Sequence, residues 1–191
     1  MTAYSLENAY MIQPETGLLV GVQFVESPNA DQRPKGIMPE LIVVHGISLP
    51  PNQFGGEAIE QLFTNQLNPD DDPFFKDIEH LKVSAHLLIR RDGEVVQYVP
   101  FHLRAWHAGH SCFNGRKGCN DFSIGIELEG TDETCYTASQ YQSLAGVIKA
   151  LWVAYPSLYA HDVVGHSHIA PGRKTDPGAY FLWRALERLL E

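Results

Sequence analysis

The 191-residue sequence has few cysteines, no long apolar run and a deficit of positive charge. Its three cysteines, Cys112, Cys119 and Cys135, cannot all pair within the chain, and none belongs to a C-x-x-C motif. This pattern disfavours a cysteine-based zinc site and favours reduced thiols. The N-terminus lacks the basic and apolar regions of a signal peptide, and no apolar stretch approaches transmembrane length. We therefore expect a cytoplasmic protein that does not cross a membrane.

The formal net charge of −9 argues against a general nucleic-acid or anionic-membrane binder. Several common catalytic motifs are also missing: H-E-x-x-H, the P-loop, G-x-S-x-G and the deaminase P-C-x-x-C. The length and the 44% hydrophobic content fit one globular domain over residues 1–191. Residues 1–40, with scattered prolines, predict an irregular arm, with one short strand at 18–24. Residues 41–191 then form the core region.

The pattern along residues 41–191 mixes strands and helices. The apolar run Leu41–Val44 predicts a buried strand that leads into His45. Residues 83–89 and 94–99 predict two strands joined by an Asp-Gly turn. Helices are expected at 56–65, after the capping box of Thr137 and Gln140, and at 180–190. Residues 101–119 show neither the periodicity of a helix nor that of a strand, which predicts a long functional loop.

Residues 122–129 alternate between apolar and polar side chains, as a strand with two different faces does. The polar face carries Ser123, Gly125, Glu127 and Glu129. One interpretation is a solvated edge. The other is the floor of a cleft, where Gly125 lets a substrate approach the backbone and one glutamate performs chemistry. The alternation does not choose between the two glutamates.

Residues 165–178 place two histidines, a lysine and an aspartate in a loop rich in glycine and proline. Taken alone it could be a polar surface loop, and His45 could be a hydrogen-bonded core histidine. Together, His45, His166 and Asp176 form the two-histidine, one-carboxylate set of a catalytic zinc site, which activates water. Such a reaction also needs a base and a cation for the oxyanion, and Glu127 and Lys174 are the candidates.

Several collinear segments between residue 40 and the C-terminus resemble the zinc-dependent N-acetylmuramoyl-L-alanine amidases of the AmpD type. They are VVHGISLPP at 43–51, FGG at 54–56, VSAH at 83–86, RRDGE at 90–94, RAWHAG at 104–109, CNDFSIGIELEG at 119–130 and HSHIAPGRKTDPG at 166–178. The resemblance implies an α/β fold shared with peptidoglycan recognition proteins, with a central mixed β-sheet flanked by helices.

The resemblance also implies the site. One Zn²⁺ per chain is expected on His45, His166 and Asp176, with Glu127 and Lys174 as catalytic residues. The implied reaction is hydrolysis of the amide between N-acetylmuramic acid, preferably in its 1,6-anhydro form, and L-alanine during cytoplasmic peptidoglycan recycling. The substrate is then an anhydro-muropeptide and the enzyme is expected to be a monomer. His107 is expected to be structural or to line the cleft, and His86 to be a buried hydrogen-bonding residue.

Some positions depart from the family pattern. His168 puts a second imidazole near the metal loop, and Gly46 replaces a frequent asparagine. Lys82 and Gly118 stand where relatives often carry arginine, and lysine lacks the planar two-pronged donor of arginine. The candidate residues for binding the acidic substrate are Lys82, Trp106, Arg116 and Arg173.

Two other functions fit the same sequence. The first is a non-catalytic module that binds peptidoglycan fragments, because this fold also serves recognition. The filled ligand and catalytic positions argue against it. The second is a zinc peptidase that cuts within the stem peptide, which only the products would distinguish.

Overall fold

The computed structural model describes residues 10–191. Four short strands, β1 (Ile12–Gln13), β2 (Leu18–Leu19), β3 (Gln23–Phe24) and β4 (Ala30–Gln32), occupy the first segment. The core follows with β5 (Leu41–Ile47), α1 (Ala58–Phe63), α2 (Phe75–Ile78), β6 (Leu87–Ile89), β7 (Val95–Gln97), β8 (Leu103–Ala105), β9 (Cys112–Phe113), β10 (Arg116–Lys117) and η1 (Cys119–Asp121). It ends with β11 (Ser123–Glu129), α3 (Ala138–Ala154), η2 (Ala160–Asp162), β12 (Val163–Gly165), α4 (His166–Ile169) and α5 (Trp183–Leu190).

The central sheet has six strands in the order β12-β5-β11-β6-β7-β3. Four neighbouring pairs are parallel: β12 with β5, β5 with β11, β11 with β6, and β7 with β3. The fifth pair, β6 and β7, forms an antiparallel hairpin. The mixed sheet predicted from the sequence is therefore confirmed. The two long strands, β5 and β11, are buried on both faces, as expected for the centre of an α/β sheet.

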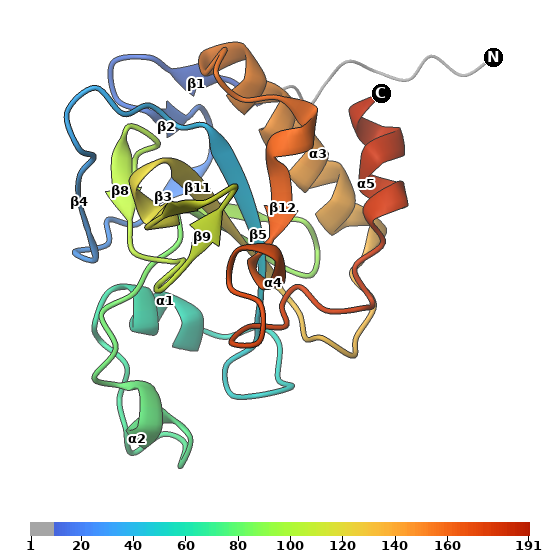
Figure 1. The fold of residues 1–191 in the computed structure, drawn as a ribbon. Coiled ribbons are helices and arrows are strands. Elements are labelled where there is room, and N and C mark those ends of the chain that lie inside the picture. The colour runs from blue at the N-terminus through green and yellow to red at the C-terminus, as the bar shows by residue number, and fades with distance from the viewer. Residues whose placement is uncertain (1–9) are drawn as a thin grey trace.

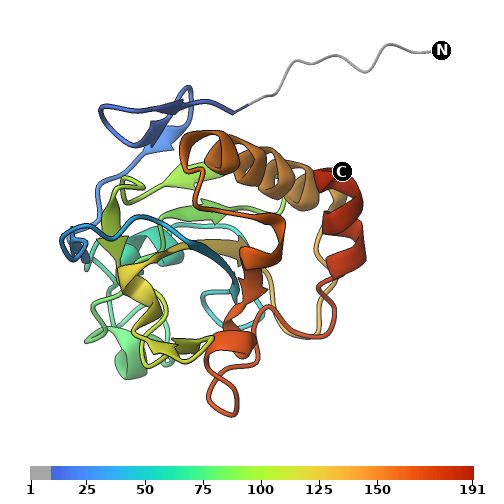
Figure 2. The ribbon, with the colours of Figure 1, turned by 45° about the horizontal axis from the view of Figure 1, so that its top comes forward.

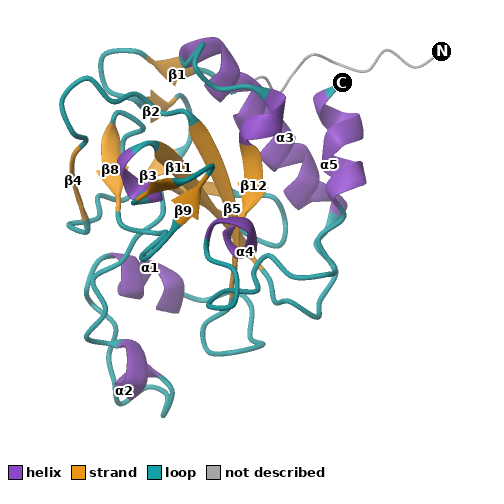
Figure 3. Ribbon diagram, in the orientation of Figure 1, coloured by secondary structure: helices purple, strands orange, loops and turns teal. Residues whose placement is uncertain are grey.

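Helices cover the two faces of the sheet. The helices α3 and α5 lie side by side over one face, as Figures 1 and 2 show from two directions. The small helices α1 and α2 lie away from this pair, in the lower part of the view in Figure 3. The apolar residues of β11 (Ile124, Ile126 and Leu128) pack with α3 in one core cluster. A second cluster gathers α1 against β6 and β7. The polar side chains of β11 therefore point to the face opposite α3.

The parallel register brings distant residues of the sequence to one point. In the pairing of β11 with β5, Glu127 lies beside His45, and in the pairing of β12 with β5, Gly165 lies beside Val44. His166 follows Gly165, so it continues this register by one residue. It lies beside His45, on the side opposite Glu127. One edge of three adjacent strands thus presents Glu127, His45 and His166 together.

Most sequence expectations for the core are confirmed, with shorter elements. The expected strand at 83–89 begins only at Leu87, and the last helix begins at Trp183. The capping box at Thr137 is present and opens α3. The loop at 101–119 contains β8 and the β9–β10 hairpin, so it is more ordered than predicted.

The N-terminal segment differs from the single short strand that the sequence predicts. From residue 10 onward it forms β1 to β4, and the side chain of Gln97 fixes its course. Gln97 accepts a hydrogen bond from the amide of Leu19 and donates one to the carbonyl of Gly17. The expectation that the N-terminus is not a signal peptide concerns residues 1–9, which lie outside the described residues. Among residues 10–191 no helix is long and apolar enough to span a bilayer.

His86 is a fully buried imidazole held by the backbone, as expected. Its Nδ1 accepts a hydrogen bond from Gly125, and its Nε2 lies 3.1 Å from the carbonyl oxygen of Leu103. The buried Arg33 guanidinium lies 3.2 Å from the same Nε2 and donates to main-chain carbonyls. Burial, and then the charge of Arg33, lowers the pKa of His86 to about 3.

This shift predicts a measurable acid sensitivity. Between about pH 6.5 and 3 the unfolded chain takes up a proton at His86 that the folded protein does not, so the free energy of unfolding falls as pH falls. The variant His86→Gln should reduce the slope of unfolding free energy against pH by up to about 1.4 kcal/mol per pH unit in this window. Urea unfolding of the metal-free protein at several pH values measures it. An unchanged slope would contradict the assignment.

Candidate metal centre and active site

Three ligand atoms from three segments meet on the face of the sheet opposite α3. Nδ1 of His45 lies 3.0 Å from Nδ1 of His166 and 3.2 Å from Oδ2 of Asp176. Nδ1 of His166 lies 3.1 Å from the same carboxylate oxygen. Four-coordinate zinc at its usual bond lengths holds its ligand atoms about 3.3 Å apart. The three atoms therefore form a nearly equilateral triangle of the size that one zinc ion requires.

The hydrogen-bond partners of the three groups also favour a cation at the centre of this triangle. Nε2 of His166 lies 3.2 Å from the carbonyl oxygen of Ala108 and 3.4 Å from Nη2 of Arg173, and a ring that binds metal through Nδ1 donates from Nε2 to this carbonyl. The Nδ1 lone pair of the neutral ring then faces the carboxylate of Asp176. Two acceptors at hydrogen-bond distance repel each other unless a proton or a metal ion lies between them. A metal ion satisfies Asp176 and both imidazoles at once.

Burial of His45 and hydrogen bonds to Asp176 keep these two groups in their metal-binding forms. Desolvation lowers the pKa of His45 to about 4, against the opposing hydrogen bond of Asp176, so the ring is neutral near pH 7. Burial alone would raise the pKa of Asp176, but the hydrogen bonds of His166 and His45 outweigh it and hold the pKa well below its usual range. A neutral imidazole and an ionised carboxylate are the states that coordinate metal.

Glu127 lies at the edge of this triangle. Its Oε1 is 4.0 Å from Nδ1 of His45, and its Oε2 is buried without a hydrogen-bond partner. Burial first, and then the charge of Asp176, raises the pKa of Glu127 well above its ordinary value, while Lys174 lowers it. A cation at the ligand triangle would lower this pKa and favour the ionised carboxylate. The position of Glu127 beside the triangle makes it the candidate for the general base.

Glu129, the alternative glutamate of the polar face, has a different role. It is 1% exposed, and its carboxylate accepts from the backbone amides of Gly55 and Arg91. Glu129 therefore ties two loops to the end of β11. The strand alternation did not distinguish the two glutamates, but their neighbours in the fold do. A loop covers Glu129, whereas Glu127 opens into the pocket.

The pocket around the triangle has a volume of about 210 Å³. Its polar wall includes the three candidate ligands, Glu127, His107 and Lys174, and its apolar wall includes Phe63 and Leu81. Lys174 is exposed at the rim, where its charge is available to a bound molecule. His168 does not belong to the triangle, because its Nδ1 accepts from the amide of Gly165.

The expected substrate-binding residues lie in four different environments. Lys82 is exposed near the pocket wall. The indole of Trp106 donates to Asp31, and the guanidinium of Arg116 pairs with Glu40 and lies 3.8 Å from the Phe122 ring centre. Both side chains are therefore engaged by neighbouring residues and only partly exposed, and neither is among the residues that line the pocket around the triangle.

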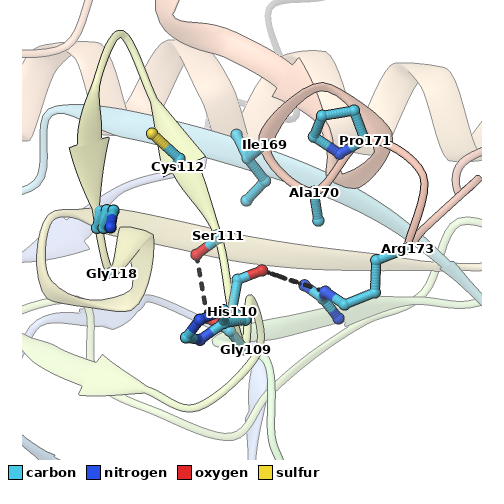
Figure 4. A pocket seen from close by; sticks show the side chains of 10 residues that line it. Gly109, His110, Ser111, Cys112, Gly118, Ile169, Ala170, Pro171 and Arg173 are labelled. Atoms are coloured by element: carbon cyan, nitrogen blue, oxygen red, sulfur yellow. Dashed lines mark hydrogen bonds between the residues drawn. The ribbon is translucent and has the colours of Figure 1, made fainter.

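Arg173 joins the metal loop to the neighbouring hairpin. Its guanidinium donates to the carbonyls of Ala108 and His110, at 2.8 and 2.7 Å. Figure 4 shows Arg173 reaching from the loop after α4 toward His110, across a groove of about 680 Å³. The groove continues along Ser111, Cys112 and Lys117. Arg173 thus contributes a positive charge to this groove beside the metal pocket.

The sequence did not indicate the residues that surround the ligands. One of the two interpretations of the strand had Gly125 admit a substrate to the backbone, and the structure contradicts that part of it. A Cβ atom at Gly125 would lie 2.4 Å from the His107 ring, so the missing side chain makes room for an imidazole. Asn120 was not singled out, although its Oδ1 accepts from the amides of His107 and Ala108. The only signal in the sequence for a group packed against β11 was the glycine inside the strand.

Comparison with known proteins identifies the family of the chain. Residues 34–179 match the family model described as N-acetylmuramoyl-L-alanine amidase. The 1,6-anhydro-N-acetylmuramyl-L-alanine amidase AmpD of Escherichia coli K12 is 60% identical over 169 residues, which cover 88% of this chain and 92% of the relative.

Solved structures show the same fold. The crystal structure of a selenomethionine AmpD derivative superposes with a TM-score of 0.91 at 54% identity, covering 95% of this chain and 99% of the other. AmpDh3 of Pseudomonas aeruginosa, solved in complex with an anhydromuramic pentapeptide, has a TM-score of 0.61 at 27% identity and covers 79% of this chain and 59% of that one. The chain belongs to the N-acetylmuramoyl-L-alanine amidase family.

Proposed function

We propose that this amidase is zinc-dependent and releases the stem peptide from 1,6-anhydro-N-acetylmuramyl-L-alanine fragments during peptidoglycan recycling. The observation that carries the proposal is the triangle of His45, His166 and Asp176, with an unpaired Glu127 carboxylate oxygen beside it. The preference for the anhydro sugar is supported by the activity for which the E. coli relative is named. The complex of the P. aeruginosa relative supports the substrate class.

The ligand triangle would hold one zinc ion. Bound zinc supplies a Lewis acid that makes water a better nucleophile and polarises the scissile carbonyl. Every proposed ligand comes from this one chain, so a monomer is sufficient. The three free cysteines suit the reducing cytoplasm, which is where fragments imported for recycling would meet the enzyme.

Two side chains would act on the proton and the charge. Glu127 would take the proton of the attacking water at its unpaired carboxylate and pass it to the leaving amine of L-alanine. Lys174, at the rim of the same pocket, would stabilise the negative charge on the carbonyl oxygen in the transition state. The apolar wall at Phe63 and Leu81 would limit the access of bulk water.

The arrangement favours catalysis over mere recognition. A binding module needs neither an imidazole pair that shares a carboxylate nor a buried glutamate with an unpaired oxygen, which costs stability. A peptidase acting within the stem peptide would use the same groups, so products must distinguish the two. Mass spectrometry of the products should show free stem peptide beginning with L-alanine, and its formation should stop when a chelator is added.

The substrate preference gives a separate prediction. We expect kcat/KM for anhydro-muropeptides to exceed that for reducing-end muropeptides by at least about tenfold, a discrimination of about 1.4 kcal/mol that a sugar pocket can readily supply. Steady-state kinetics on the two substrates, matched in their stem peptide, measure this ratio. Equal efficiencies would remove the recycling assignment and leave the amidase activity in place.

A further inference from the structure

The two ligand imidazoles are supported by adjacent residues of one loop. Nε2 of His45 lies 2.8 Å from Nδ1 of His107, and Nε2 of His166 lies 3.2 Å from the carbonyl oxygen of Ala108. Both ligand rings therefore meet residues 107–108 with the nitrogen that faces away from the metal triangle. We call residues 107–108 the ligand clip.

The clip is itself held in place by three contacts. The Asn120 side chain accepts from both of its amides, at 3.2 and 2.8 Å. Arg173 donates to the Ala108 carbonyl, and the ring of His107 occupies the space above Gly125 that a side chain would fill. The ligand clip is therefore anchored from β11, from η1 and from the loop that carries Asp176.

The protons along the clip can be assigned from the partners. When a cation occupies the triangle, Nδ1 of His45 must offer a lone pair, so its Nε2 carries the proton and donates to Nδ1 of His107. The remaining His107 nitrogen, Nε2, is then protonated and lies 3.0 Å from the hydroxyl oxygen of Ser123. Ser123 is fully buried, and its hydroxyl can accept this bond.

We propose that His107 is a positioning residue for the metal site: supported by Ser123, it fixes His45 in the tautomer that presents Nδ1 to the ion. Metal-binding histidines usually donate to a carboxylate or carbonyl, and loss of such a partner typically weakens metal binding about 10- to 100-fold. Here an imidazole takes that place for His45, while the Ala108 carbonyl serves His166. This inference rests on the proposed zinc site.

The test compares two substitutions at one position. His107→Leu removes the acceptor, and the zinc dissociation constant should rise about 10- to 100-fold. His107→Gln keeps a side-chain oxygen that can accept from His45 and should restore most of the affinity. His110→Ala is the matched control, because it removes an exposed imidazole from the same loop while leaving its carbonyl to Arg173.

Zinc affinity is measured by competition with a chromophoric chelator, and the tautomer of His45 by ¹⁵N NMR of the zinc-loaded protein. The parent spectrum should show a protonated Nε2 on His45. Equal zinc affinity in the parent and His107→Leu, or an equal loss in His107→Gln and His107→Leu, would overturn the inference. Failure of the parent to bind one zinc ion would instead overturn the proposed function. Unfolding curves of the metal-free variants exclude a general loss of fold.

Discussion

The variant Asp176→Ala should lose zinc and amidase activity together. Asp176 supplies the only carboxylate of the ligand triangle, and its Oδ2 lies within 3.2 Å of both imidazole nitrogens. Without it, two neutral imidazoles remain to hold a divalent ion. Since structural zinc sites bind with about 10–16 kcal/mol over four ligands, we expect the affinity to fall by at least about 100-fold.

The loss of zinc and the loss of turnover are measured separately. Elemental analysis after dialysis gives the zinc content, and kinetics on an anhydro-muropeptide give the turnover. Full zinc occupancy in Asp176→Ala would show that the ligand assignment is wrong.

A control for this experiment is Asp132→Asn. The backbone of Asp132 packs against Gly178 of the same loop, but its carboxylate does not belong to the ligand triangle. We expect its zinc content and turnover to match the parent. A loss in this variant would indicate that any disturbance of the loop releases metal, and the result for Asp176→Ala would then say little about coordination.

The sequence predicts His45, His166 and Asp176 as one ligand set, and the structure brings their side-chain atoms close together. Imidazole and carboxylate are typical zinc ligands, and the apolar run before His45 predicts a buried parallel strand. The register of β5 with β11 and β12 then brings residues about 80 and 120 positions away to the same edge. Only the pairing of these strands had to be supplied by the structure.

The sequence could not predict which groups surround the ligands. Glu127 and Glu129 share one face of one strand and have the same chemistry, and they differ only in what the fold places over them. The ring of His107 comes to Gly125 from a loop whose sequence has no periodic pattern. Arg116 pairs with Glu40 and lies over the Phe122 ring, contacts that its charge alone does not predict. Such contacts depend on tertiary packing, which local patterns do not determine.

The variant Glu127→Gln should keep zinc and lose turnover. The amide has nearly the shape of the carboxylate but cannot take the proton of the attacking water, so kcat should fall by about 100-fold or more. Glu127 contributes no direct ligand atom to the triangle, and its Oε2 has no hydrogen-bond partner to lose. Zinc content should therefore stay at one ion per chain.

The neighbouring variant Glu129→Gln should behave in the opposite way, which makes the pair a sharp test. The new amide nitrogen cannot accept from the backbone amide of Gly55 or Arg91, so unfolding should become easier by about 1–3 kcal/mol. Its kcat should stay near that of the parent. Glu127→Gln, in contrast, removes a buried carboxylate whose pKa is raised, so the unfolding free energy of the metal-free variant near pH 7 should equal or exceed that of the metal-free parent. Denaturant unfolding, zinc analysis and kinetics on both variants decide the matter: normal turnover in Glu127→Gln, with loss of turnover in a folded Glu129→Gln, would identify Glu129 as the base.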